Sequence, residues 1–350
     1  MIVRDEAASL HQNLKSVVEN APLSYWVVHD TGSKDSTPHI VQSFFSQHNI
    51  RGELHHRKWE NFGKNRQMAL LDAEGKAPFA MFLDADCLIS GKLPPLDPAV
   101  DSYMILSHRN GTSYPTKQLI RNNGTFRWRG VVHEGLYFNG NNERCELLEG
   151  VRIENRSCGA RSRDEATYYR DARLLAKEIS DLPKGDEDLL PRYLFYCGNS
   201  WRDAGCPREA VYWYKKRIDA GGWRDEVYLS YLNLGIELAK INDYDAAFLA
   251  WNEGTEICPD RAECFYKLAQ LERERKRFNS AIVFARSAMK MPEPYSDRLF
   301  VWRDVYRYWA LFEFLWSTKN LGRLDEHDKE IQLFRSRGAP THLFQIIGII

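Results

Sequence analysis

The stretch YWVVHDTGSKDST, residues 25 to 37, decides the fold that we expect for this chain. Its apolar beginning, Tyr25–Val28, predicts a buried strand, and the glycine that follows permits a tight turn. Ser36 and Thr37 are residue types that cap helices, and Pro38 suits a first helical turn. A strand, a tight turn and a helix in succession form the repeating unit of an α/β fold.

The same alternation continues on both sides of this stretch. Short apolar runs predict strands at residues 2–3, 53–55 and 79–83, and helical spacing of apolar residues recurs at 10–18, 40–45 and 68–71. This alternation predicts a Rossmann-like, mostly parallel sheet. Ligands of such sheets bind at the carboxyl ends of the strands. Polar clusters follow three of the predicted strands, and we expect them to meet at one edge: residues 4–6, 30–33 and 84–86.

Beyond about residue 163 the pattern is entirely helical and contains an internal repeat. Leu234-Gly235 recurs as Leu268-Ala269, and Tyr244 recurs as Phe278, at an offset of 34 residues. Small residues where paired helices cross and an aromatic residue before the second helix are similar to tetratricopeptide repeats. We therefore expect an α/β domain at 1–160, a helical linker at 161–185 and an all-α repeat domain with a C-terminal cap at 186–350.

Composition limits the classes of function. With 43% hydrophobic and 27% charged residues, the 350-residue chain has the balance of a globular protein. Its formal net charge is zero, so no global field attracts it to nucleic acid or anionic lipid. The segment from Ser102 to His133 has no acidic residue and includes five cations, which suits an anionic ligand such as a diphosphate.

Seven cysteines without CxxC spacing argue against a disulfide framework and favour a reducing compartment. No secretory leader is evident and no apolar run reaches about 18 residues. We therefore expect a cytoplasmic protein without membrane insertion.

Two carboxylates define the first candidate site. Asp84 and Asp86 follow the apolar run Met81-Phe82-Leu83. Side chains two residues apart on an extended segment point the same way, so both can reach one hard cation or its waters. A divalent ion there would relieve their repulsion and bridge to phosphate oxygens.

Further polar residues strengthen this interpretation. Asp30 ends an apolar strand and could accept a hydrogen bond from a base N–H. Lys64 and Arg66 stand at the start of a predicted helix, where cations oppose the helix dipole and an anionic partner would be favourable. The segment that begins at Arg121 contains a histidine and a glutamate side by side. These residues, His133 and Glu134, could supply a third metal ligand and a base.

Together these residues resemble the family 2 glycosyltransferases of the GT-A fold, in the branch that carries C-terminal tetratricopeptide repeats. The resemblance lies in an ordered set of segments: MIVRDE (1–6), HDTGSKDST (29–37), NRQMAL (65–70), FLDADC (82–87) and GVVHEG (130–135).

The resemblance implies a role for each matching residue. The loop from Arg4 to Glu6 would line the nucleoside, and Asp30 would contact the base. Asp84 would hold the ribose, Asp86 and His133 would hold the metal, and Glu134 would be the general base. Arg66 matches the family's arginine and would bind the nucleotide, and from their positions in the sequence we add Lys64 and Arg121 as nucleotide-binding cations.

The chain also departs from the family pattern. Gln67 replaces an asparagine, Asp5 replaces another, and Cys87 stands where relatives carry an acid after the paired aspartates. Cys87 would leave the metal site one carboxylate short. Met1 leaves only three residues for the first strand.

These inferences lead to a metal-dependent inverting glycosyltransferase. A nucleotide-diphosphate sugar, with a UDP-sugar as the expected donor, would donate to a hydroxyl or thiol with Mn²⁺ or Mg²⁺ as cofactor. The acceptor is open among a peptide or protein, a glycan and a modified DNA base, and the repeats could bind it or form a homodimer. The alternatives are a repeat adaptor with an inactive transferase domain and a nucleotidyltransferase.

Overall fold

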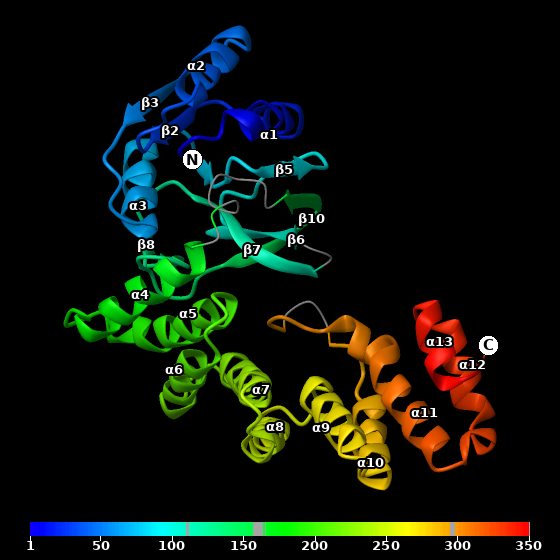
Figure 1. The fold of residues 1–350 in the computed structure, drawn as a ribbon. Helices are drawn as coiled ribbons and strands as arrows, with labels where there is room; N and C mark the ends of the chain where they lie inside the picture. The colour runs from blue at the N-terminus through cyan, green and yellow to red at the C-terminus, as the bar shows by residue number, and fades with distance from the viewer. Residues whose placement is uncertain (110–111, 157–163, 165, 295–297, 350) are drawn as a thin grey trace. The chain divides into compact units, whose positions relative to one another are not determined.

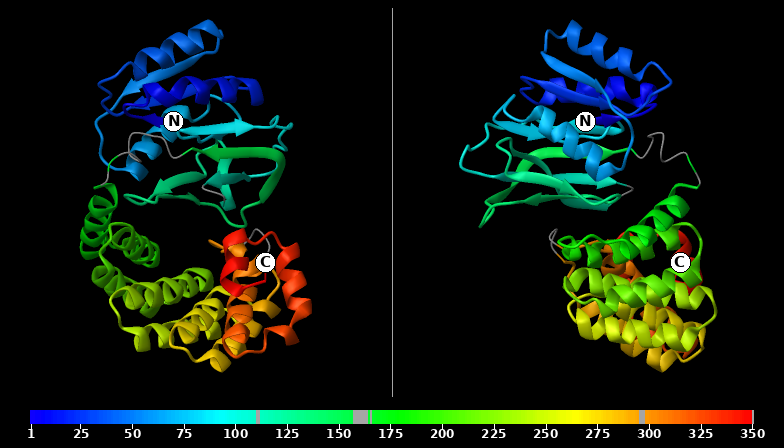
Figure 2. Two further views of the ribbon diagram at one scale, coloured as in Figure 1. Left: turned by 45° about the vertical axis from the view of Figure 1, so that its right-hand side comes forward. Right: turned by 90° about the vertical axis from the view of Figure 1, so that its left-hand side faces the viewer.

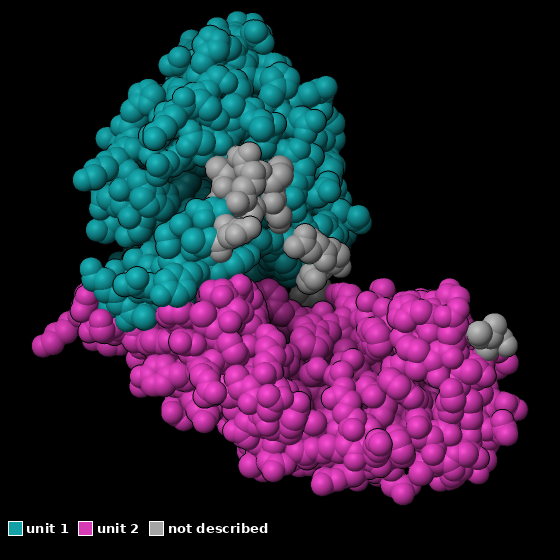
Figure 3. Space-filling view, viewed as in Figure 1, with its two compact units in different colours: residues 1–178 teal, residues 179–350 magenta. Residues whose placement is uncertain are grey.

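The structure is a computed structural model that describes all residues except 110–111, 157–163, 165, 295–297 and 350 (Figure 1). The chain divides into two compact units, Met1–Glu178 and Ile179–Ile350, which Figure 3 draws in separate colours.

A small parallel sheet begins the first unit. Its strands β1 (Ile2–Val3), β2 (Trp26–Asp30) and β3 (Gly52–His56) lie in the order β1-β2-β3, and every neighbouring pair is parallel. Helix α1 (Ala7–Asn20) connects β1 to β2, and α2 (Thr37–Gln47) connects β2 to β3 (Figure 1). Helix α3 (Phe62–Ala73) follows β3. This strand–helix alternation is the predicted one.

A second, mixed sheet follows. It consists of β4 (Phe79–Met81), β5 (Cys87–Ser90), β6 (Ser102–Arg109), β7 (Thr112–Arg121) and β10 (Cys145–Asn155), in the order β4-β7-β6-β10-β5. Strand β10 is parallel to β6, whereas the other neighbours in this sheet are antiparallel. A hairpin of β8 (Phe126–Arg129) and β9 (Gly135–Phe138) completes the unit.

The predicted mostly parallel sheet is therefore wrong for this part of the unit. Strands that are consecutive in the chain pair in parallel only through a long crossover, usually a helix, and among the described residues no helix lies between β4 and β10. Strands β6 and β7 follow each other within a few residues, and strands joined by so short a connection pair antiparallel.

Apolar faces of the helices cover these sheets. On α1, Leu10, Leu14 and Val17 are buried at helical spacing. Leu10 and Leu14 pack with Val28 of β2 and with Phe44 of α2, and Val17 packs in the core of the second sheet. Helix α1 thus contributes to the cores behind both sheets.

Among the described residues, the second unit is made of helices (Figure 2). A linking helix, α4 (Thr167–Ser180), precedes α5 (Leu190–Asp203), α6 (Pro207–Asp219), α7 (Arg224–Lys240), α8 (Tyr244–Ile257), α9 (Glu263–Glu274) and α10 (Phe278–Lys290). A π-helical turn (Val305–Trp309) leads into α11 (Ala310–Asn320), α12 (Asp328–Ser336) and α13 (Thr341–Ile347).

The helices pack in sequential pairs, α5 with α6, α7 with α8, and α9 with α10. Tyr244 and Phe278, which the sequence pairs at an offset of 34, are the first residues of α8 and α10. A Cβ atom on Gly235 would lie 2.3 Å from Nε1 of Trp251, so the glycine lets the indole pack against α7. These paired helices and small crossing residues confirm the predicted tetratricopeptide-like repeats.

Candidate active site

The loops after β1 and β2 are joined by hydrogen bonds. The backbone N–H of Asp5 donates to Oγ of Ser33 at 3.0 Å, and that of Lys34 donates to Oδ1 of Asp5 at 2.7 Å. The N–H of Glu6 donates to Oγ1 of Thr37 at 2.8 Å. The polar clusters that follow these two strands therefore meet at one edge, as expected for parallel strands.

Asp30 is buried at the end of β2, with 3% of the residue exposed. Its Oδ1 accepts the backbone N–H of Ser33 at 3.1 Å, and its Oδ2 lies 3.1 Å from Nδ1 of His56. Both carboxylate oxygens thus have a partner that fixes their direction. Arg4, by contrast, has a half-exposed side chain at the same edge.

The segment with the two aspartates alternates between core and surface. Ala85 and Cys87 are buried, whereas Asp84 and Asp86 are partly exposed, so the two carboxylates leave the segment on the side away from the core. Burial, followed by the nearby charges of Asp84 and Asp86, raises the pKa of the Cys87 thiol far above its ordinary value. Cys87 is thus a neutral core residue and does not replace the missing acid.

The side chain of Asn13 on α1 is hydrogen-bonded to the backbone of this segment. Its buried side-chain amide donates to the backbone oxygens of Asp84 at 2.9 Å and Cys87 at 2.6 Å. The backbone N–H and Nε of Arg156 each lie 3.3 Å from the backbone oxygen of Asp86. The backbone of the paired aspartates is therefore fixed by two distant parts of the chain.

Arg66 joins the paired aspartates to the histidine–glutamate segment. Its Nε donates to Oε1 of Glu134 at 2.5 Å and its NH2 group to Oδ1 of Asp84 at 2.6 Å. The side chains of Arg66 and Glu134 are only 12% and 10% exposed, whereas that of Asp84 is 47% exposed. Burial opposes the charged form of Arg66, but the attraction of Asp84 and Glu134 prevails and raises its pKa.

The start of α3 contacts the residues just before His133. The N–H of Phe62 donates to the backbone oxygen of Val131, and that of Gly63 to Gly130, each at 3.1 Å. A Cβ atom on Gly63 would lie 2.1 Å from that oxygen of Gly130. This close approach positions His133 and Glu134 beside α3. His133 has a positive φ of 52°, a conformation that costs energy for a non-glycine residue.

The residues fit the divalent cation that the resemblance implies. An imidazole from His133 and a carboxylate from Asp86 are suitable ligands, and Mg²⁺ or Mn²⁺ sites in transferases commonly use few protein ligands and complete the shell with phosphate and water. One oxygen of Asp84 is already paired with Arg66 in this arrangement.

Two other predicted residues lie apart from this cluster. Nζ of Lys64 is in an exposed ion pair with Glu60 at 3.2 Å. Arg121 pairs in register with Phe79, the first residue of β4, whereas Asp84 lies beyond the last residue of that strand. The register therefore separates Arg121 from Asp84, and its guanidinium lies 4.0 Å from Oδ1 of Asp101 instead.

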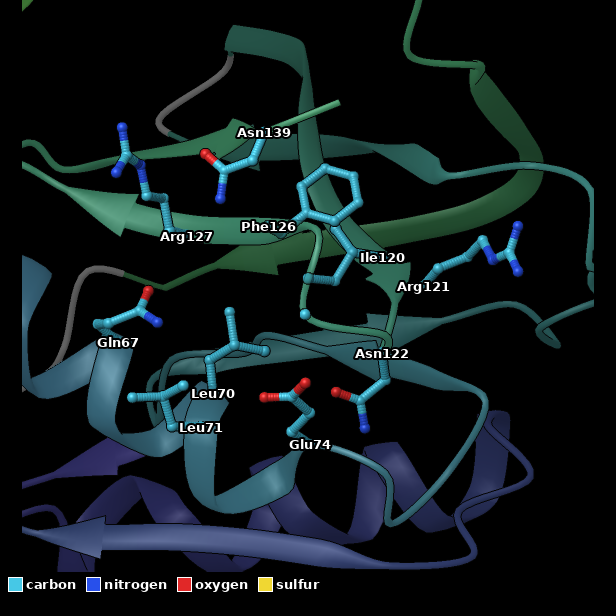
Figure 4. Close-up of a pocket in the computed structure, with 11 residues that line it drawn as sticks. Gln67, Leu70, Leu71, Glu74, Ile120, Arg121, Asn122, Phe126, Arg127 and Asn139 are labelled. Atoms are coloured by element: carbon cyan, nitrogen blue, oxygen red, sulfur yellow. The ribbon is translucent and has the colours of Figure 1, made fainter. Parts of the chain in front are cut away.

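Arg121 instead borders a pocket of about 290 Å³ between α3 and the ends of β7 and β8 (Figure 4). In Figure 4 its side chain extends to the side opposite Gln67 and Arg127. None of the other predicted site residues lines this pocket.

Sequence reasoning missed the residues that support the site. Asn13 and His56 were not selected, although each contacts a predicted site residue directly. One signal was present for Asn13, because it lies beside the apolar stripe of α1 at Leu10, Leu14 and Val17, where a polar side chain needs a buried partner.

The N-terminal part of the chain matches a protein-family model. Residues 1–140 match the model of glycosyl transferase family 2. The N-terminal part of the chain is a family 2 glycosyltransferase domain. Within this glycosyltransferase domain lie the joined loops, the paired aspartates, Arg66 and Glu134.

Solved structures resemble the helical part of the chain. MamA is 17% identical over 49% of this chain and 88% of its own, with a TM-score of 0.38. BtubC from P. vanneervenii is 15% identical over 50% and 77%, with a TM-score of 0.41. At these scores the likenesses carry no argument about function. No curated protein matches the chain, and no helix of the described residues is long and apolar enough to cross a membrane.

Proposed function

We propose that the glycosyltransferase domain transfers a sugar from a nucleotide-diphosphate sugar, such as a UDP-sugar, to a hydroxyl or thiol acceptor with inversion. The observation that carries this proposal is the pair of hydrogen bonds from Arg66 to Asp84 and Glu134. They bring the expected ribose ligand and the expected base into one partly enclosed cluster.

The chain's own residues perform the binding and the proton transfer in this proposal. The joined loops after β1 and β2 and the buried Asp30 bind the nucleoside, and Asp84 binds its ribose. Arg66 fixes Oε1 of Glu134, and we assign Oε2 to accept the acceptor's proton as the new bond to the anomeric carbon forms. A carboxylate oriented by an arginine needs little reorganisation when the acceptor arrives.

A divalent cation held by Asp86 and His133 would neutralise the charge that develops on the leaving diphosphate. Because the nucleotide leaves from one face of the sugar and Glu134 acts on the other, a single displacement inverts the anomeric configuration.

A screen of nucleotide sugars with Mn²⁺ or Mg²⁺ tests the proposal. We expect release of nucleoside diphosphate without pyrophosphate, loss of release with EDTA, and loss in Asp86→Ala. Pyrophosphate as product would instead establish nucleotidyl transfer. An absence of both products and of nucleotide binding would support an adaptor with an inactive domain.

A further inference from the structure

A cluster of metal-ligand side chains lies on α3's side of the parallel sheet, apart from the paired aspartates. His29 of β2 and His55 of β3 are directly paired in the parallel register, so their side chains leave the same face. Asp72 reaches this face from α3. One ligand atom from each of these three residues lies within 4.8 Å of the other two.

A fourth ligand is available on β3. Glu53 is two residues before His55, and its Oε2 lies 2.9 Å from Nε2 of that histidine. The other oxygen of Glu53 accepts hydrogen bonds from Nζ of Lys76 at 2.7 Å and from the hydroxyl of Tyr25. Hydrogen bonds to the other atoms of a metal ligand commonly fix its orientation, and here they would hold Oε2 of Glu53 in place.

We propose that His29, Glu53, His55 and Asp72 form a zinc-type transition-metal site that fastens β2, β3 and α3 together. Nε2 of His29 lies 2.9 Å and Nε2 of His55 lies 3.9 Å from Oδ2 of Asp72. Ligand atoms of a tetrahedral zinc site lie about 3.3–3.5 Å apart, given zinc–ligand distances of about 2.0–2.2 Å. The distances from Asp72 to the two histidines fall on both sides of this range, so small movements of these three side chains would close the site around an ion. Glu53 lies outside the group within 4.8 Å, and its side chain would turn toward the ion to become the fourth ligand.

The proposed site would contain two imidazoles, whereas the expected Mn²⁺ or Mg²⁺ site would contain only that of His133. A second imidazole favours zinc and its neighbours in the transition series over Mg²⁺, which prefers oxygen ligands. His29 is fully buried and the other ligands are partly buried, so a bound ion would be shielded from bulk water. A bound ion would stabilise β2 at His29, the residue next to Asp30.

One cation competes for the site. The NH2 group of Arg57 donates to Oδ2 of Asp72 at 2.8 Å, and its side chain is 40% exposed. The guanidinium must move aside when a metal binds, because two positive groups would otherwise share one oxygen. We therefore expect Arg57→Ala to bind the metal several-fold more tightly than the unchanged protein.

Metal analysis and cobalt spectroscopy on the full chain test the proposal. We expect one equivalent of zinc after dialysis and, with Co²⁺, the strong visible bands of a tetrahedral site. His55→Ala should weaken binding by at least about tenfold, since outer-shell changes alone cost about 10–100-fold. His39→Ala, on the exposed face of α2, is the matched histidine control, and Asp86→Ala should leave the bands unchanged.

Circular dichroism checks whether each variant folds. If His55→Ala does not fold, Glu53→Gln replaces it. It should also lose the tetrahedral bands. No zinc in the unchanged protein, or equal binding in a folded His55→Ala or Glu53→Gln, would overturn the proposal. Loss of binding in Asp86→Ala alone would place the ion at the paired aspartates and also overturn it.

Discussion

At the scale of single residues, Glu134 is the side chain whose chemistry matters most. If it is the base, Glu134→Gln should reduce kcat by about 10²–10⁴-fold with little change in KM, because the amide keeps the shape and loses the proton-accepting charge. Steady-state kinetics with the donor found in the screen measure this. Glu149→Gln, an exposed change on β10, is the control. A kcat within twofold of the unchanged enzyme would remove Glu134 from this role.

Arg66 shows how far single residues could be predicted. Its place at the start of α3 indicated an anionic partner, and that much follows from the helix dipole alone. The partners are Asp84 and Glu134, which are 18 and 68 residues away along the chain. Spacing within a helix contains no information on such distant pairs, so the ion pairs could not be derived from the sequence. The same holds for the contact between Asp30 and His56.

At the scale of secondary-structure elements, Asn13 connects α1 to the paired aspartates. Asn13→Leu should lower the free energy of unfolding of the first unit by about 1–3 kcal/mol, because it removes the buried donor from two backbone oxygens. Transfer activity should fall as well, since Asp84 loses its support. Chemical denaturation and initial rates measure the two effects. Lys15→Ala on the exposed face of α1 should change neither, and an equal loss in both variants would contradict the role of Asn13.

The helix pairs depend on close contacts between small and large residues. Gly235→Ala should destabilise the second unit by about 1–3 kcal/mol, because its Cβ would overlap the indole of Trp251. The indole also donates to the backbone oxygen of Leu232 at 3.0 Å, so it cannot move freely. Glu256→Ala, exposed on α8, is the control. Thermal unfolding measures both, and equal midpoints would show that the helices separate without cost.

Elements also differ in how readily the sequence predicts them. The first three strands and their helices follow from alternating apolar runs, and the repeats follow from the offset of 34 residues. The mixed sheet was not predicted, because strand direction depends on which strands pair. The parallel pairing of β6 with β10 joins residues about 45 positions apart, with a hairpin between them. Local patterns do not encode that choice.

At the scale of the whole molecule, each unit has core clusters of its own among the described residues. The clusters around Leu10, Ile105 and Ile120 belong to Met1–Glu178, and those around Tyr214 and Phe314 belong to Ile179–Ile350. Residues that share a core unfold together, whereas separate cores can unfold separately. Two transitions are therefore expected on heating.

Variants and ligands assign each transition to its unit. Asn13→Leu should lower only one midpoint and Gly235→Ala only the other. UDP with Mn²⁺ should raise the midpoint that Asn13→Leu lowers, because a ligand stabilises the unit that binds it by about 2.7 kcal/mol at one hundred times its Kd. Differential scanning calorimetry measures all three shifts. A single transition that both variants lower equally would mean that the two cores unfold as one. A ligand shift in the other transition would move the nucleotide site out of the glycosyltransferase domain.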